Sequence, residues 1–161
     1  MKGVALAAFA LVAVFLLAST GVKAKVTVTT VTMCGPNPTV NLDLAKQWID
    51  DEGVLHVRSA PYTVDLTGLY PTTVTGLEGY NVDLTTGAVD FFGTMTAVGG
   101  LGTFDGRFSG TFPAGPETAF TGQATLHGDA GLLTSTFEYP SAACASEGGM
   151  AVYLTLLTPS G

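Results

Sequence analysis

Twelve consecutive residues decide the fold: Leu101-Gly-Thr-Phe-Asp-Gly-Arg-Phe-Ser-Gly-Thr-Phe112. The even-numbered positions hold only glycine and phenylalanine, whereas the odd-numbered positions after Leu101 hold only polar residues. Because side chains alternate between the two faces of a β-strand, this pattern predicts a strand with one apolar face and one wet face. Small residues beside large ones suit the narrowing interior of a strongly coiled sheet.

The same alternation extends to other segments. Apolar residues or glycine occupy every second position from Phe120 to Leu126 and from Tyr62 to Gly68, with polar residues between them. Turn-forming residues recur about every 8–12 positions, which is typical of an all-β domain. We expect strands at 26–33, 54–58, 62–69, 74–84, 88–98, 101–112, 118–127, 132–137 and 150–157.

These strands predict an all-β fold, an antiparallel up-and-down β-barrel of about eight or nine strands. A β-sandwich of two sheets would produce the same alternation and stays the alternative. The chain has 161 residues, 47% of them apolar and 12% charged, with 21 Gly and 8 Pro. This composition argues against a disordered tail and against a coiled coil, and the length suits one domain.

Two segments carry a resemblance to known proteins: Gly102-Thr-Phe-Asp-Gly-Arg-Phe-Ser-Gly110 and Phe120-Thr-Gly-Gln-Ala-Thr-Leu-His-Gly128. They resemble the Gly- and Phe-rich antiparallel strands of small secreted barrels, namely the lipocalin-like (calycin) proteins and the allene oxide cyclase and dirigent barrels. The resemblance covers about 40 residues and is one of composition. It implies a barrel fold, and no functional residue is transferred from these families.

The first 24 residues have the features of a secretory signal peptide. Lys2 precedes an apolar run from Val4 to Ala18, and Val22-Lys23-Ala24 places small residues at the expected cleavage site. The run is shorter than the roughly 20 apolar residues that span a bilayer. We therefore expect cleavage after Ala24, a single domain at 25–161, and a secreted, periplasmic or otherwise extracytoplasmic protein.

Export gives the two cysteines a role. Cys34 and Cys144 are the only cysteines, one near each end of the expected mature chain. In an oxidising compartment such a pair forms a disulfide, so we expect a bridge that closes a loop of about 110 residues. A reactive or metal-binding pair would need a neighbouring His or a Cys-x-x-Cys motif, and neither is present.

The segment from Asn41 to Gly53 has two interpretations. Its apolar residues fall on one helical face, with Asn41 as a candidate N-cap. A helix would, however, place three acidic residues at its negative end. A hairpin that pairs 46–50 with 54–58 across the turn Asp51-Glu52-Gly53 therefore fits slightly better.

The sequence lacks the residues that several classes of function require. The net charge of −7 disfavours nucleic acid and, after signal cleavage, membrane surfaces as partners. A Gly-x-Ser-x-Gly nucleophile motif is missing, and Ser109 lies on the wet face of its strand. His56 and His127 are far apart in the sequence and fall on polar faces, so we expect solvated imidazoles, no metal site and no cofactor.

One acidic residue breaks the alternation. Glu78 shares a strand face with Val74, Tyr80 and Val82. A carboxyl buried there would have a raised pKa and could act as a general acid or hold the polar group of a ligand. The alternative, which the flanking glycines favour, is a β-bulge at Gly76 or Gly79 that turns Glu78 outward.

The remaining candidates are aromatic residues that fall on the apolar faces. We expect a shared interior formed by Tyr62, Tyr70, Tyr80, Phe91 or Phe92, Phe104, Phe108 and Phe120. So many rings favour an interior filled by side chains, whereas a ligand site requires a cavity of at least about 300 Å³.

Three hypotheses of function follow. The first is a non-enzymatic secreted barrel that binds a small apolar or amphipathic molecule through Tyr62, Glu78, Tyr80, Phe104, Phe108 and Phe120. The second is a structural or interaction module that recognises a protein partner in a cell envelope or extracellular assembly, through an exposed strand edge. The third is a barrel-type isomerase or cyclase in which Glu78 and a neighbouring tyrosine form an acid-base pair.

Overall fold

The computed structural model describes residues 25–114 and 119–160, so the expected signal peptide and the expected strand start at Thr118 lie outside the described residues. Within the described residues the fold is all-β. The strands are β1 (Lys25–Gly35), β2 (Thr39–Val40), β3 (Lys46–Ile49), β4 (Val54–Gly68), β5 (Thr72–Asp83), β6 (Val89–Gly99), β7 (Gly102–Phe112), β8 (Phe120–Gly128), β9 (Gly131–Tyr139) and β10 (Met150–Ser160). Two short 3-10 helices, η1 (Leu42–Leu44) and η2 (Ala142–Glu147), complete it.

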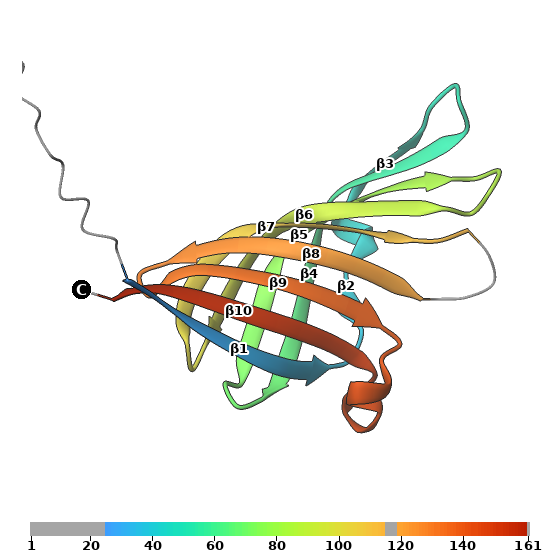
Figure 1. The fold of residues 1–161 in the computed structure, drawn as a ribbon. Helices are drawn as coiled ribbons and strands as arrows, with labels where there is room; N and C mark the ends of the chain where they lie inside the picture. Colours follow the sequence, from blue (N-terminus) through green and yellow to red (C-terminus); the bar gives the residue numbers. More distant parts are fainter. Residues whose placement is uncertain (1–24, 115–118, 161) are drawn as a thin grey trace, which may run out of the picture.

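The strands form one antiparallel sheet that closes on itself. From β4 to β10 each strand pairs with the next, β10 pairs with β1, and β1 pairs with β4, which gives a hydrogen-bonded ring of eight strands. The predicted up-and-down antiparallel architecture is confirmed, and a single barrel-like sheet takes the place of the sandwich alternative (Figure 1).

The ring closes over a short distance only. The β1 residues that pair with β4 are Met33, opposite Gly68, and Cys34, opposite Thr67. Farther along the chain, β2 and then β3 pair with the same edge of β4. The segment from β1 to β3 therefore follows one edge of β4 in three pieces. The β3–β4 and β5–β6 hairpins extend at the end of the sheet opposite the described chain termini (Figure 1).

Strand β4 corrects one expectation. The predicted strands at 54–58 and 62–69 are a single strand, and its pairing with β5 shifts between Val57 and Ala60. Two residues of β4, Arg58 and Ser59, stand there opposite one residue of β5, and Ser59 has φ 60°. This bulge keeps the strand continuous while it bends.

The predicted hairpin at 46–58 is confirmed. Lys46 pairs with Arg58 and Ile49 with Leu55. Asp50 orders the turn because its Oδ1 accepts hydrogen bonds from the backbone N–H groups of Glu52 at 3.0 Å and Val54 at 2.9 Å. Asn41 caps the 3-10 helix η1, with its side chain accepting a hydrogen bond from the backbone of Asp43.

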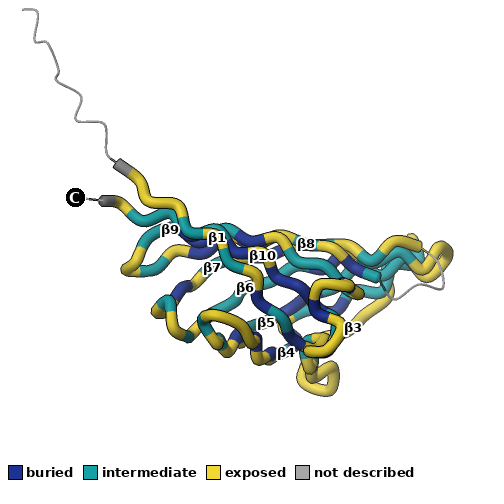
Figure 2. The backbone as a smooth tube through the Cα atoms, turned by 60° about the horizontal axis from the view of Figure 1, so that its bottom comes forward, coloured by how far each residue is buried: buried dark blue, intermediate teal, exposed yellow. Residues whose placement is uncertain are grey.

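The alternation quoted at the outset divides the interior from the surface. Phe104 and Phe108 of β7 are buried, and Thr103, Asp105, Arg107 and Ser109 are exposed. Figure 2 shows the same alternation of buried and exposed residues along the other strands. The predicted disulfide is also present: Cys34 of β1 bonds Cys144 of η2, which is fully buried.

Aromatic rings cover glycines throughout the sheet. Each ring belongs to the residue that pairs with the glycine on the adjacent strand, and a β-carbon added to the glycine would collide with that ring. The pairs are Tyr62 with Gly76, Phe91 with Gly110, Phe108 with Gly93, Phe104 with Gly128 and Phe137 with Gly122. Such pairing stabilises a coiled sheet because the ring fills the space left by the missing side chain.

Candidate functional site: an apolar cavity with one carboxyl

The interior of the ring contains a cavity of about 350 Å³. Side chains from most strands of the ring form its wall, and most of them are apolar. Val64, Leu66, Phe104, Leu126, Leu133 and Leu154 are examples. The expectation that side chains fill the interior is therefore wrong. The rings of Phe91, Phe104, Phe108 and Phe137 lie over glycines of adjacent strands, against the sheet. The volume is at the lower end of the range for small-molecule pockets.

A cluster of aromatic rings occupies the interior where β7 ends and β8 begins. Phe120 lies 5.1 Å from Phe112, 5.8 Å from Phe91 and 5.5 Å from Tyr139, measured between ring centroids. Phe137 joins the cluster at 6.3 Å from Phe120. Edge-to-face and tilted rings at these distances attract one another, so this side of the wall is firmly packed.

Glu78 is the one acidic residue among the described residues of the cavity wall. It lies on β5 opposite Ala60 of β4 and Gly93 of β6, and only 7% of it is exposed. The expected bulge at Gly76 or Gly79 is wrong: the irregularity belongs to β4, and β5 continues in regular register past Glu78. The alternation of β5 therefore holds, and Glu78 lies among the lining residues of the cavity.

Burial changes the acidity of this carboxyl. Desolvation raises the pKa of Glu78 to about 7, and a hydrogen bond from the Tyr80 hydroxyl opposes part of that rise. The pKa of Tyr80 is raised by burial and then by the neighbouring Glu78 carboxylate. The pKa of Tyr62 is raised for the same two reasons. Near neutral pH the site therefore has a carboxyl that exchanges its proton beside two neutral phenols.

Three aromatic residues lie near Glu78 in the cavity wall. The Tyr62 ring lies over Gly76, two residues before Glu78, and the Phe108 ring lies over Gly93, its partner on β6. These two rings meet edge to face, with centroids 5.5 Å apart. Tyr80 lies two residues after Glu78 on the same face. The two residues that pair with Glu78, Ala60 and Gly93, are small, so they leave space for its carboxyl beside these aromatic residues.

The structure brings all six candidate ligand-binding residues together. Tyr62, Glu78, Tyr80, Phe104, Phe108 and Phe120 line the one cavity, and so does Phe91. Tyr70 packs beside the core without lining the cavity, and Phe92 lies outside, where the Arg58 guanidinium covers its ring at 5.0 Å. Sequence reasoning missed Ser135, which lines the cavity from β9. The alternation Leu133, Ser135, Phe137 was the signal that could have found it.

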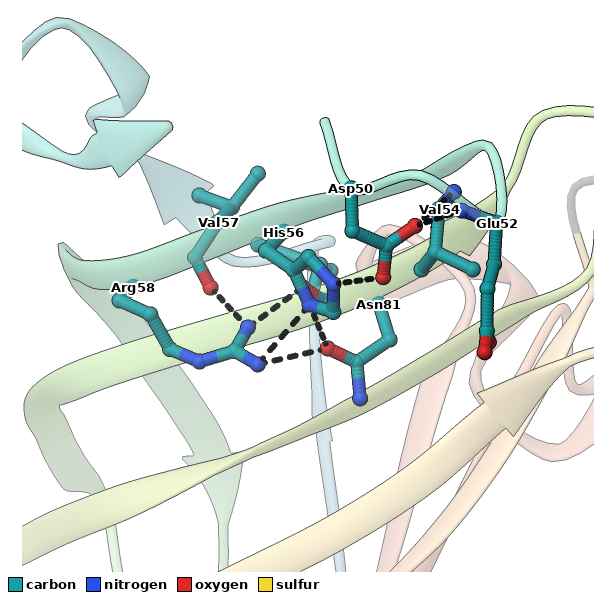
Figure 3. A network of polar contacts seen from close by, with 8 residues as sticks. Asp50, Glu52, Val54, His56, Val57, Arg58 and Asn81 are labelled. Atoms are coloured by element: carbon teal, nitrogen blue, oxygen red, sulfur yellow. Dashed lines mark hydrogen bonds and ion pairs between the residues drawn. The ribbon is translucent and has the colours of Figure 1, made fainter. Parts of the chain in front are cut away.

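A second group of side chains lies on the outer surface of the β3–β4 hairpin (Figure 3). The ring of His56 is 2.7 Å from Asp50 through Nε2 and 2.9 Å from the Asn81 carbonyl oxygen through Nδ1. Trp48 stacks on that ring at 5.0 Å. The expectation of a solvated imidazole is thus wrong for His56, although His127 is exposed as predicted.

Arg58 connects this outer group to the backbone of β4 and β5. Its Nη1 donates to the backbone oxygens of Val57 and Tyr80, both at 2.8 Å, and its Nη2 donates to Asn81 at 2.7 Å. The two backbone oxygens flank the β4 bulge, where regular pairing is interrupted. We therefore assign this group to holding the hairpin and the bulge in place.

Other kinds of site are missing from the part of the chain that the structure describes. No three His, Cys, Asp or Glu side chains gather closely enough there to hold a metal ion. Within the same residues, no helix has the length and apolar character required to cross a membrane.

Comparison of the chain with models of known protein families found no match, and neither did comparison with curated proteins or with solved structures. The fold and the site by themselves define a class: a closed antiparallel sheet around a largely apolar cavity, in whose described wall Glu78 is a buried carboxyl.

Proposed function

We propose that the protein is a secreted, non-enzymatic binding protein that holds one small amphipathic molecule inside its sheet. The observation that carries the proposal is the cavity of about 350 Å³, whose largely apolar wall includes the carboxyl of Glu78. Pockets of this kind combine apolar surface for affinity with a few polar groups that orient the ligand.

The proposed location has two supports. One is the signal-like sequence of the first 24 residues, and the other is the Cys34–Cys144 disulfide. Disulfides persist in oxidising compartments and are rare in the cytosol. Peptide mapping of the protein from culture medium or periplasm, with Lys25 as the first residue, tests the proposal. A mature protein that retains Met1 in the cytosol would contradict it.

Binding is tested with a neutral apolar dye and with native mass spectrometry. We expect N-phenyl-1-naphthylamine to bind with a stoichiometry of one, and protein purified from its own host to carry a small molecule. Ala97→Leu adds bulk to the cavity wall and lowers dye affinity. Val98→Leu is the matched control, because Val98 is 53% exposed on the outer face. Equal affinities in both variants would contradict the proposal.

A barrel-type isomerase or cyclase is a second candidate. The position of Tyr80 beside Glu78 in the cavity wall favours it, because burial raises the pKa of Glu78 to about 7, a value that suits proton transfer near neutral pH. If a substrate is found, Glu78→Gln should lower kcat by about a hundredfold or more. Unchanged turnover in that variant would remove this candidate.

An interaction module is a third candidate, and the free edge of β1 favours it. Among the described residues, β1 pairs with β4 only through Met33 and Cys34, and Val26 and Val28 are 51% and 60% exposed. An unpaired strand edge can accept a strand from a protein partner. Size-exclusion chromatography that finds only monomer at all concentrations would count against self-association.

A further inference from the structure

The charges of the cavity wall restrict the ligand. Among the described residues that line the cavity, Glu78 is the only acidic one, and none is Lys, Arg or His. An anionic ligand such as a fatty acid would bring a second negative charge beside Glu78 with no positive partner. A neutral ligand would leave an ionised Glu78 without charge compensation. Only a positively charged ligand would neutralise the carboxylate of Glu78.

The surroundings of Glu78 add a second restriction. The ring of Tyr62 lies over Gly76, which is two residues before Glu78 on β5. The ring of Phe108 lies over Gly93, which pairs with Glu78 on β6. Tyr80, two residues after Glu78 on β5, lines the cavity as well. Aromatic faces attract a cation through the negative charge of their π-electrons, most strongly where water is excluded. A carboxylate framed by aromatic rings is thus suited to an ammonium group.

The rest of the cavity suits an apolar body. Beyond Glu78 the wall consists mainly of Leu, Val, Met and Phe side chains. The volume of about 350 Å³ limits that body to a small one.

We propose that the ligand is a small protonated amine with an apolar or aromatic body, whose ammonium group bonds to the carboxylate of Glu78 between Tyr62, Tyr80 and Phe108. This inference rests on the proposed binding function and specifies the chemical class of its ligand.

Binding of such an amine depends on pH through Glu78. The titratable groups that face it are Tyr62 of β4 and Tyr80 of β5, whereas β6 and β7 bring only Gly93 and Phe108 against it. Burial raises the pKa of both tyrosines, so they stay neutral between pH 6 and pH 8. With a Glu78 pKa of about 7, amine affinity should rise about tenfold over that interval as the carboxyl ionises.

The test uses three probes that match in size: 2-phenylethylamine, 2-phenylethanol and phenylacetate. Titration calorimetry of the disulfide-intact protein at pH 8 should find the amine bound about tenfold or more tightly than the alcohol, with phenylacetate weakest. Glu78→Gln should reduce amine affinity by about tenfold or more and change alcohol affinity by less than about threefold. Tyr62→Phe should retain amine binding, whereas Tyr62→Leu should weaken it because the ring is lost.

The outcomes separate this inference from the proposed function. If the alcohol or N-phenyl-1-naphthylamine binds and the amine has no advantage, the amine assignment is overturned and the binding function stands. If amine affinity is the same in wild type and Glu78→Gln, the assignment is also overturned. If neither the dye nor any of the three probes binds, the binding function fails, and the amine assignment fails with it.

Discussion

The ring of Phe108 on β7 lies over Gly93 on β6, its direct partner in the sheet. A β-carbon at position 93 would lie 2.6 Å from Cε1 of that ring and would also collide with the backbone oxygen of Leu77. The glycine is therefore required by the ring that covers it. Phe108 also lines the cavity, and Gly93 is the residue of β6 that pairs with Glu78, so this packing lies next to the cavity carboxyl.

Gly93→Ala should destabilise the protein by about 1–3 kcal/mol, because the ring of Phe108 and the strand backbone have to move apart. Gly100→Ala is the matched control, since its nearest neighbour is the Tyr70 ring at 3.3 Å and its backbone has no unusual φ. The midpoint of urea denaturation measures both. Equal midpoints for the two variants would show that the ring and glycine do not depend on each other.

The stability of the protein should fall as pH rises from about 4.5 to 7 relative to Glu78→Gln. The folded state raises the pKa of Glu78 from 4.5 to about 7, so the buried carboxyl stabilises the fold fully below pH 4.5. That contribution is lost as pH rises through 7 and amounts to about 3 kcal/mol. Urea denaturation of both proteins across this range measures it. If the free energy of unfolding depended on pH in the same way in both proteins, Glu78 would be solvated and the predicted burial effect would be contradicted.

Asp50 and His56 should support the β3–β4 hairpin most strongly between about pH 4 and pH 6.5. The hydrogen bond with Asp50 raises the pKa of His56, and its stabilisation is present below 6.5 and lost as pH rises through the folded value. The hydrogen bond with His56 lowers the pKa of Asp50, whose contribution is present above 3.8 and lost as pH falls through the folded value.

A proton NMR titration measures this pair directly. The pKa of His56 should lie above 6.5 in the wild-type protein and fall in Asp50→Asn, which keeps the size of the side chain but removes its charge. A His56 titration that does not respond to Asp50→Asn would contradict the contact.

Removal of the disulfide through the double variant Cys34→Ala and Cys144→Ala should cost about 4 kcal/mol of stability. The bond joins residues 110 positions apart. In the chain-entropy model, a bridge across so long a loop lowers the conformational entropy of the unfolded chain and thereby stabilises the folded state. Thermal and urea unfolding of the double variant measure the loss. A difference below about 1 kcal/mol would indicate that the fully paired β1 and β10 hold the ends of the chain without the bond.

Much of the candidate site follows from the alternation of residues. The inward positions of Tyr62, Tyr80, Phe104, Phe108 and Phe120 were predictable because each lies in a strand of strict period two. The orientation of Glu78 was less certain, since glycine on both sides is also the pattern of a bulge. Which of the two paired strands contains the bulge depends on the register between β4 and β5, and a single strand does not encode it.

The outer group at His56 was missed for a similar reason. Asp50, His56, Arg58 and Asn81 come from two hairpins, and only the pairing of β4 with β5 brings Asn81 to His56. The bulge then leaves two backbone oxygens that the Arg58 guanidinium can reach. Nothing in the local sequence indicates that an arginine on a polar strand face will bond to backbone atoms across a strand pair.

Local patterns thus determined most of the strands, their two faces and the hairpin at 46–58, because period-two alternation and turn residues act over a few positions. The partners of the disulfide followed from the presence of only two cysteines and from the expected export. Tertiary structure decided the ring closure through β1 and β4, the bulge at Arg58 and Ser59, and the open cavity beside Glu78. These features depend on register between strands and on how rings from different strands share one space. The residues involved are distant in the chain, so their contacts exist only after the sheet has closed.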